Sequence, residues 1–221
     1  MRPKNVKALY DKIAVKYHQN RSKAPNDYTE LPKIIELAGN VKSKKVLDLG
    51  CGTGKHAKEY LKKGAILTGV DVSEKMIELA KKSCKNQGEF LLADFEKIKF
   101  EKESFDLINA SFSLHYSKNL NHLFKQFNSW LKPNGRVIFS ISHPMQYYLK
   151  IKDFDFSKSK KYWFRLNTYD VEVFNYYHPI GKYCESFISN GFQLNTFVET
   201  IWTEKKHKIP NAVIFEIIKI N

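Results

Sequence analysis

The chain has 221 residues, of which 43% are hydrophobic and 14% aromatic, so we expect one globular domain and exclude a disordered or low-complexity protein. Its 37 basic and 23 acidic residues give a net charge of +14, and no apolar run is long enough to cross a membrane. The three cysteines form no C-x-x-C pair and the start shows no apolar signal-peptide core, which together indicate a reducing, cytoplasmic location.

Residues 1–39 predict two helices before the first strand. In the first helix, over 5–20, apolar side chains recur at helical spacing. They are Val6, Leu9, Tyr10, Ile13 and Tyr17. The second helix should begin near Pro32, cover 31–37 and end at Gly39, because proline favours the first turn of a helix and glycine its end.

The stretch VLDLGCGTG at residues 46–54 predicts a buried strand that ends in a glycine turn. A helix over 55–63 follows, so the segment reads as the first half of a βαβ unit, whose turn faces the ligand crevice. A P-loop is excluded, because Gly50 and Gly54 enclose three residues where that loop needs four. The dinucleotide fingerprint is weakened, because Lys55 stands where its third glycine belongs.

The following strands also end in polar residues. The second strand, 65–71, ends at Asp71, and Ser73 is a good N-cap for the next helix. The third strand, 89–93, is followed by Asp94, and the fourth, 105–110, leads into residues that should form the floor of a site. Since the carboxyl ends of parallel strands share one edge of a sheet, these residues should lie close together.

The second half of the chain predicts the rest of the sheet. A helix over 120–131 and the turn LKPNG precede a fifth strand at 135–142. Residues 145–177 hold eleven aromatic side chains, and a helix over 178–190 leads to a closing hairpin at 192–200 and 212–220. The repeated order of strand, turn and helix indicates an α/β fold: a Rossmann-like, doubly wound, seven-stranded sheet with a reversed last strand and helices on both faces.

The pattern D-x-G-x-G-x-G after a buried strand, Asp71 at the tip of the second strand and LKPNG before the fifth resemble the class I S-adenosylmethionine-dependent methyltransferase family, in particular its small-molecule, type 11-like members. The resemblance covers residues 40–142. It implies one methyltransferase domain over 1–221, with capping helices at 1–39 and the aromatic-rich insert at 145–177 over the acceptor pocket.

The resemblance implies S-adenosyl-L-methionine as the cofactor and S-adenosyl-L-homocysteine as the product. Asp71 would accept hydrogen bonds from both ribose hydroxyls, Asp94 would contact the adenine amino group, and Tyr17 would lie near the sulfonium. The residues expected to bind the cofactor are Tyr17, Asp48, Gly50, Cys51, Gly52, Thr53, Gly54, Asp71, Val72, Met76, Ala93, Asp94, Phe95, Asn109 and Ala110.

Methyl transfer depends chiefly on alignment of the acceptor and exclusion of water, so the sequence names only candidates for a general base. These candidates are His115, His143 and His178. The segment Ser142-His143-Pro144 resembles a motif of some small-molecule methyltransferases, which implies an acceptor pocket with Tyr147, Tyr177 and Glu199. For each histidine the alternative is a loop residue that hydrogen-bonds the backbone. No metal-ligand spacing is present.

The net charge of +14 leaves an RNA or tRNA methyltransferase as an alternative. We expect a small-molecule acceptor instead, because four of the 37 basic residues are Arg and the lysines are spread along helix faces. The place after the fourth strand reads Asn109-Ala110-Ser111-Phe112, without the proline of base-modifying relatives. A catalytically silent, cofactor-binding regulatory protein is a third interpretation, and the chain should be a monomer or homodimer.

Overall fold

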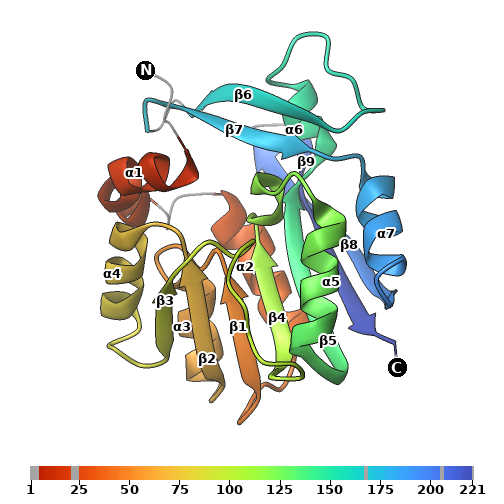
Figure 1. The fold of residues 1–221 in the computed structure, drawn as a ribbon. Helices are drawn as coiled ribbons and strands as arrows, with labels where there is room; N and C mark the ends of the chain where they lie inside the picture. Colours follow the sequence, from red (N-terminus) through yellow and green to blue (C-terminus); the bar gives the residue numbers. More distant parts are fainter. Residues whose placement is uncertain (1–4, 21–24, 167–168, 205–206, 221) are drawn as a thin grey trace.

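A computed structural model describes residues 5–20, 25–166, 169–204 and 207–220, which form a seven-stranded sheet with helices on both faces and a hairpin over one edge (Figure 1). The strand order is β3-β2-β1-β4-β5-β9-β8. The strands of this sheet are β1 (Lys45–Leu49), β2 (Ile66–Asp71), β3 (Glu89–Leu92), β4 (Phe105–Ser111), β5 (Leu131–Ser142), β8 (Phe192–Glu204) and β9 (His207–Lys219).

The first five strands run parallel, and β9 lies antiparallel to both β5 and β8. This confirms the predicted α/β class with its reversed last strand. The turn predicted at 132–135 is an irregularity within β5: Phe105 pairs with Leu131 but Leu107 pairs with Arg136, so these residues loop out of the ladder. The closing hairpin is longer than predicted, because β8 and β9 remain paired almost to the turn.

Helices bury the two faces of the sheet in separate clusters. On one face, α5 (Leu120–Trp130) and α7 (Ile180–Ile188) place aromatic rings such as Phe124, Phe127 and Phe187 against the strands. On the other face lie α2 (Pro25–Ala38), α3 (Lys55–Lys62) and α4 (Glu74–Ser83). The second helix begins at Pro25 and not near Pro32, because Pro25 itself takes the favoured first position.

The predicted insert contains secondary structure that the sequence pattern does not reveal. After the short helix α6 (Pro144–Tyr148), strands β6 (Lys160–Leu166) and β7 (Val171–Tyr177) pair as an antiparallel hairpin of their own. The hairpin crosses the top of the molecule in Figure 1, beyond the carboxyl ends of the parallel strands, near the short 3-10 helix η2 (Leu114–Tyr116).

Helix α1 (Val6–Asn20) joins this hairpin to the body of the protein. Its Leu9 and Ile13 pack with Val171 and Val173 of β7 in one apolar cluster. Its Asp11 accepts a hydrogen bond from the Ser73 hydroxyl at the start of α4, at 2.6 Å. The helix therefore contacts both the hairpin and the sheet domain.

Candidate functional site

One large cavity, of about 750 Å³, lies at the carboxyl ends of β1, β2 and β4, between these strands, α1 and the β6–β7 hairpin. This edge of an open α/β sheet is where such folds bind ligands. Its lining includes eleven of the residues predicted for the site. They are Tyr17, Gly50, Cys51, Gly52, Thr53, Asp71, Val72, Met76, Asp94, Phe95 and His115.

The glycine turn forms one wall of the cavity. Gly50 has a φ of 70°, and its N–H donates to the Val70 carbonyl at 2.8 Å, so the turn is fixed to β2. A Cβ on Gly50 would come within 2.7 Å of the Ser113 Cβ. Gly52 has a φ of 53°, but a Cβ there would meet no atom within 4 Å. A side chain at Gly52 would therefore point into open space in the cavity, which a ligand would otherwise occupy.

Asp71 connects the second strand to this turn. Its Oδ2 accepts a hydrogen bond from the Gly52 N–H at 2.9 Å, and its Oδ1 accepts one from the Ser73 N–H at 2.9 Å. The side chain is 9% exposed, and burial raises the pKa of Asp71 to about 6 despite these hydrogen bonds. Each carboxylate oxygen still has acceptor capacity for a ligand in the cavity.

Asp94 lies further along the same cavity, after β3. Its Oδ1 accepts a hydrogen bond from the Glu96 N–H at 3.0 Å, and its Oδ2 lies 3.5 Å from the Lys97 Nζ. Asp94 therefore shapes the following turn, as the capping alternative expects, while its carboxylate remains in the lining. The two roles are compatible.

Five predicted cofactor residues lie outside the lining: Asp48, Gly54, Ala93, Asn109 and Ala110. Asp48 is buried and its Oδ1 accepts a hydrogen bond from Asn109 Nδ2 at 2.7 Å, so this pair joins β1 to β4 beneath the turn. Burial raises the pKa of Asp48. At Gly54 a Cβ would lie 3.1 Å from the Ala80 Cα, so this glycine allows α3 and α4 to approach each other closely.

Of the three candidate histidines, His115 lines the cavity. Its side chain is 6% exposed, and burial, with a smaller effect of His178, lowers its pKa to about 3. Its Nδ1 is buried without a hydrogen-bond partner among the residues that the structure describes. His115 is therefore neutral at physiological pH, and it stands beside Tyr116 with ring centroids 4.5 Å apart.

His143 and Glu199 form a pair outside the lining. The Met145 N–H donates to His143 Nδ1 at 3.1 Å, so Nδ1 carries no proton and the ring caps the start of α6. The other nitrogen, Nε2, lies 2.8 Å from Glu199 Oε1 and donates to it. The Glu199 side chain is 49% exposed, so this pair joins α6 to β8 near the surface.

His178, Tyr147 and Tyr177 hold the insert in place and also lie outside the lining. His178 Nε2 donates to the Ser117 carbonyl at 3.0 Å, and its Nδ1 accepts from the Ser159 hydroxyl at 3.0 Å. Burial lowers the pKa of His178. Tyr147 and Tyr177 belong to an aromatic cluster inside the insert. These contacts match the alternative in which histidines hydrogen-bond the backbone.

The lining also contains residues that motif analysis does not select. The hydroxyls of Tyr10 and Tyr116 lie 2.8 Å apart and connect α1 with η2. Phe174 packs edge-on against Tyr116, and the neighbouring Asn175 donates from Nδ2 to the Tyr147 hydroxyl at 3.2 Å. Tyr10 lies in the helical pattern of the sequence and Tyr116 in the segment expected as the floor. Phe174 and Asn175 belong to the aromatic-rich insert expected over the acceptor pocket, but no motif selects them individually.

A buried polar network lies next to the glycine turn, around His56 at the start of α3. Glu30 of α2 is 0% exposed and lies 3.2 Å from the His56 Nε2. It also accepts hydrogen bonds from the hydroxyls of Ser111, at 2.5 Å, and Ser140, at 2.6 Å. Burial alone would raise the pKa of Glu30, but His56 and the hydroxyl groups lower it below its usual value. Glu30 is therefore an ionised carboxylate that orients His56, a residue of the cavity wall.

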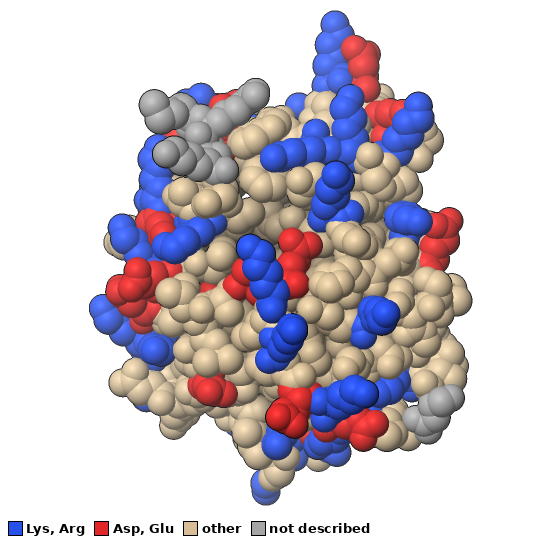
Figure 2. Space-filling view, in the orientation of Figure 1, with Lys and Arg blue, Asp and Glu red and all other residues tan. Residues whose placement is uncertain are grey.

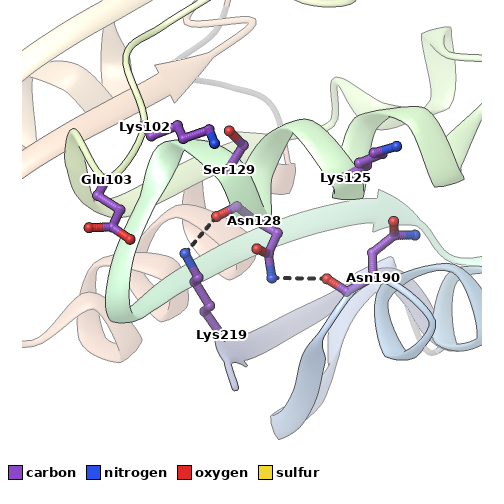
Figure 3. Close-up of a pocket in the computed structure, with 7 residues that line it drawn as sticks. All are labelled: Lys102, Glu103, Lys125, Asn128, Ser129, Asn190 and Lys219. Atoms are coloured by element: carbon purple, nitrogen blue, oxygen red, sulfur yellow. Dashed lines mark hydrogen bonds between the residues drawn. The ribbon is translucent and has the colours of Figure 1, made fainter. Parts of the chain in front are cut away.

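A second, shallower hollow of about 470 Å³ lies near the amino ends of β4 and β5, far from this edge (Figure 3). Its Lys219 ammonium donates to the carbonyls of Asn128, at 2.9 Å, and Leu131, at 2.8 Å. Asn128 in turn donates to the Asn190 carbonyl at 3.0 Å. These polar groups are thus engaged with the backbone, and the hollow shows no group prepared for chemistry.

Within the described ranges, no group of three or more His, Cys, Asp or Glu side chains could hold a metal ion. Among the same residues, no helix has the length and apolar character needed to cross a bilayer. The cysteines Cys51, Cys84 and Cys184 are free thiols.

Known proteins resemble this chain in both sequence and fold. A family model described as "Methyltransferase domain" matches residues 47–139. An uncharacterized Haemophilus influenzae protein is 41% identical over 128 residues, which are 54% of this chain and 50% of that protein. The demethylmenaquinone methyltransferase of Thermotoga maritima is 35% identical over 139 residues, 61% of this chain and 60% of the relative. The solved S-adenosylmethionine dependent methyltransferase of Mesorhizobium loti has a TM-score of 0.70 at 23% identity, covering 89% of this chain and 98% of that one.

The chain spans about half the length of the curated relatives it matches. The matched segment 47–139 runs from β1 into β5 and contains the glycine turn, Asp71 and Asp94, which are the sequence features that form the wall of the cavity. The fold of this chain agrees with that of the solved neighbour over nearly the whole length of the neighbour. Residues 47–139 therefore match the methyltransferase domain that the family model describes, and the fold of the chain is that of the solved S-adenosylmethionine dependent methyltransferase.

Proposed function

We propose that this protein transfers a methyl group from S-adenosyl-L-methionine to an oxygen or nitrogen atom of a small molecule, releasing S-adenosyl-L-homocysteine. The observation that carries the proposal is the joint position of Gly52 and Asp71. The turn leaves open space where a side chain would be, and the Asp71 carboxylate borders the same space while it accepts a hydrogen bond from the Gly52 N–H. A ligand with an extended chain and a ribose matches both features.

The residues in the lining fit this cofactor. Asp71 would accept hydrogen bonds from the ribose hydroxyls, Asp94 would contact the adenine edge, and the backbone of Gly50 to Gly52 would lie beside the amino-acid part. Tyr17 of α1 lines the other side of the cavity. The cavity volume of about 750 Å³ lies within the usual range for a small-molecule site.

When bound, S-adenosyl-L-methionine supplies a methyl group on a positively charged sulfur, so transfer is a displacement by the acceptor atom. The protein's own contribution is to hold the acceptor in line and to exclude water. The aromatic side chains of α1, η2 and the hairpin provide the apolar walls for this. His115 is neutral and lies in the lining, so it can accept a hydrogen bond from the acceptor, although its lowered pKa makes it a weak base.

Surface charge supports a small acceptor over a nucleic acid. Figure 2 shows the basic side chains of one face scattered among acidic ones, without one continuous basic stripe. A surface that binds RNA concentrates its positive charge along the path of the phosphates. The free cysteines fit a cytoplasmic protein that remains reduced.

Calorimetric titration tests the proposal with three ligands: S-adenosyl-L-methionine, S-adenosyl-L-homocysteine and NAD. We expect the first two to bind with dissociation constants in the micromolar range and NAD to show no heat of binding. Binding of NAD without S-adenosyl-L-methionine would refute the proposal. A screen with radiolabelled methyl donor and a metabolite library then identifies acceptors. Transfer to tRNA, with an affinity that falls steeply with salt, would favour the RNA alternative.

A further inference from the structure

The cavity has two ends that differ in charge. The acidic side chains of its lining, Asp71, Asp94 and Glu96, all lie on the side of β2 and β3. At the other end, the turn after α6 contributes Lys150 and the β6–β7 hairpin contributes Lys161, and the described lining there contains no acidic residue. The rest of the lining also contains lysines: Lys7 and Lys97, which pair with Asp11 and Asp94, and Lys55 at the start of α3. The end formed by the insert differs because its lining holds basic side chains without acidic ones.

Both lysines rest on aromatic rings of the insert. The Lys161 Nζ lies 3.9 Å from the centroid of Phe174, and Trp163 and Tyr176 are also near it, at 5.0 Å and 5.8 Å. The Lys150 Nζ lies 5.6 Å from the centroid of Phe164. Phe174 and Phe164 themselves line the cavity, so these cation–π contacts hold the ammonium groups at its border.

No ion pair links either ammonium to a carboxylate within the part of the chain that the structure describes. Burial lowers the pKa of Lys150, and no nearby acid offsets this effect. A ring face satisfies a cation only partly, because it cannot accept the strong hydrogen bonds that a carboxylate or phosphate oxygen accepts. Both cations therefore border the cavity with aromatic rings, and not carboxylates, as their described partners.

The remaining surface at this end is largely aromatic. Tyr116 and Phe174 meet edge to face, with centroids 5.9 Å apart, and Tyr169 contributes a further ring to the lining. Aromatic rings that present their edges and faces to a cavity favour the binding of a flat, unsaturated ligand. Asn175 adds a polar group whose Oδ1 lacks a hydrogen-bond partner among the described residues.

We infer that the methyl acceptor is a planar aromatic molecule that carries an anionic group, and that Lys150 and Lys161 bind that group while the rings of η2 and β7 contact its body. This inference rests on the proposed function and specifies its substrate class. Carboxylate and phosphate share the chemistry that these lysines recognise, so the test includes both.

Calorimetry on protein saturated with S-adenosyl-L-homocysteine tests the inference. The probes are 2-naphthoate, 2-naphthyl phosphate and the neutral 2-naphthamide. We expect at least one anion to bind about tenfold more tightly than the amide, which corresponds to 1.4 kcal/mol. Lys150→Gln and Lys161→Gln should each weaken binding of that anion about fivefold, in line with a partly exposed ion pair, and leave the amide unchanged. The stronger of the two anions identifies the group.

Lys125→Gln is the matched control, because Lys125 is an exposed lysine of the second hollow, outside the cavity. It removes the same charge and should leave all three affinities unchanged. An anion that binds no better than the amide, no binding of any probe, or an equal loss in Lys125→Gln would overturn the inference. Binding of S-adenosyl-L-homocysteine is measured first: its failure refutes the proposed function, whereas its success without a preference for anions refutes the substrate class alone.

Discussion

Asp71 offers the sharpest test of the site, because one carboxylate performs two separable tasks. It holds the glycine turn through the Gly52 N–H and the start of α4 through the Ser73 N–H. In the proposed complex it also accepts hydrogen bonds from the ribose. We compare Asp71→Ala, Asp71→Asn and Asp94→Ala, and use Asp106→Ala as the control, since Asp106 bonds to Lys45 and Lys132 at the opposite edge of the sheet.

The expected magnitudes follow from the hydrogen bonds that each variant loses. A hydrogen bond to a charged group contributes about 1.5–3 kcal/mol, and the Asp71 oxygens are already shared with two backbone donors, so each ribose bond should lie at or below the lower end. Asp71→Ala should therefore weaken S-adenosyl-L-methionine binding by about 1–2 kcal/mol more than Asp94→Ala, roughly fivefold to thirtyfold. Asp71→Asn should fall between them.

The pKa of Asp71 adds a pH dependence with a definite sign. Burial raises this pKa from 3.8 to about 6. Between these two pH values Asp71 is protonated in the folded apo protein but ionised in the unfolded chain. Above pH 6, ionisation of Asp71 therefore lowers the free energy of unfolding of the apo protein by about 3 kcal/mol. The ionised form is the better acceptor, so cofactor affinity should be constant above about pH 7 and fall below about pH 6.

Calorimetry from about pH 5 to pH 8, with the melting temperature of each apo variant, measures both tasks. We expect Asp71→Ala to change stability and affinity together, Asp71→Asn to lose the fall in affinity below pH 6, and Asp106→Ala to retain wild-type affinity. A dissociation constant for S-adenosyl-L-methionine that is unchanged in Asp71→Ala would show that the cofactor lies elsewhere. A fall below pH 6 that persists in Asp71→Asn would assign the titration to another group.

Two further predictions concern the walls of the cavity. Gly52→Val should abolish cofactor binding, and its positive φ should lower the free energy of unfolding by only about 1–2 kcal/mol. Gly54→Val should destabilise the fold more, because its Cβ would lie 3.1 Å from the backbone of α4. Denaturant unfolding and calorimetry together distinguish these outcomes, and cofactor binding in Gly52→Val equal to that of the wild type would refute the placement of the cofactor. Glu30→Gln should lower the free energy of unfolding by about 1–3 kcal/mol, because it weakens the buried hydrogen bonds that Glu30 accepts from the hydroxyls of Ser111 and Ser140; unchanged stability in urea unfolding would refute a structural role for these bonds.

The parts of the fold that the sequence predicts correctly are those with local signals. Val46, Leu47 and Leu49 are apolar and buried, and the glycines that follow need positive φ values, as Gly50, Gly52 and Gly54 show. The acidic residue at the end of β2 is recognisable from its position alone. These signals require no knowledge of distant contacts, which is why the glycine turn and Asp71 could be placed beside one cavity in advance.

The hairpin escapes sequence analysis because its strands have no clear alternation. In β6 the charged residues are exposed and four apolar residues are at least partly buried, so the strand shows no single buried face at every second position. Its contacts with α1 and α6 lie in two separate apolar clusters, so tertiary packing decides its structure. Lys161 reads as a surface charge in the sequence, and only the paired strands place it on Phe174.

The histidines show the same limit. His178 is held by Ser117, 61 residues away, so its structural role has no local signature. His143 does precede a proline at the start of a helix, and this is the signal that could have identified it as a cap. A histidine near the end of a strand can thus be catalytic or structural, and only its hydrogen-bond partners distinguish these two roles.

The attachment of α1 has a thermodynamic consequence for any ligand of the cavity. The helix is held by the Asp11–Ser73 and Tyr10–Tyr116 hydrogen bonds and a small apolar cluster, so it can detach at a lower free energy than global unfolding requires. Its Tyr10 and Tyr17 also line the cavity. A ligand that touches them favours the docked helix by the free energy of those contacts, and the docked helix favours the ligand by the same amount. Occupancy of the cavity should thus be visible as slower amide hydrogen exchange along α1.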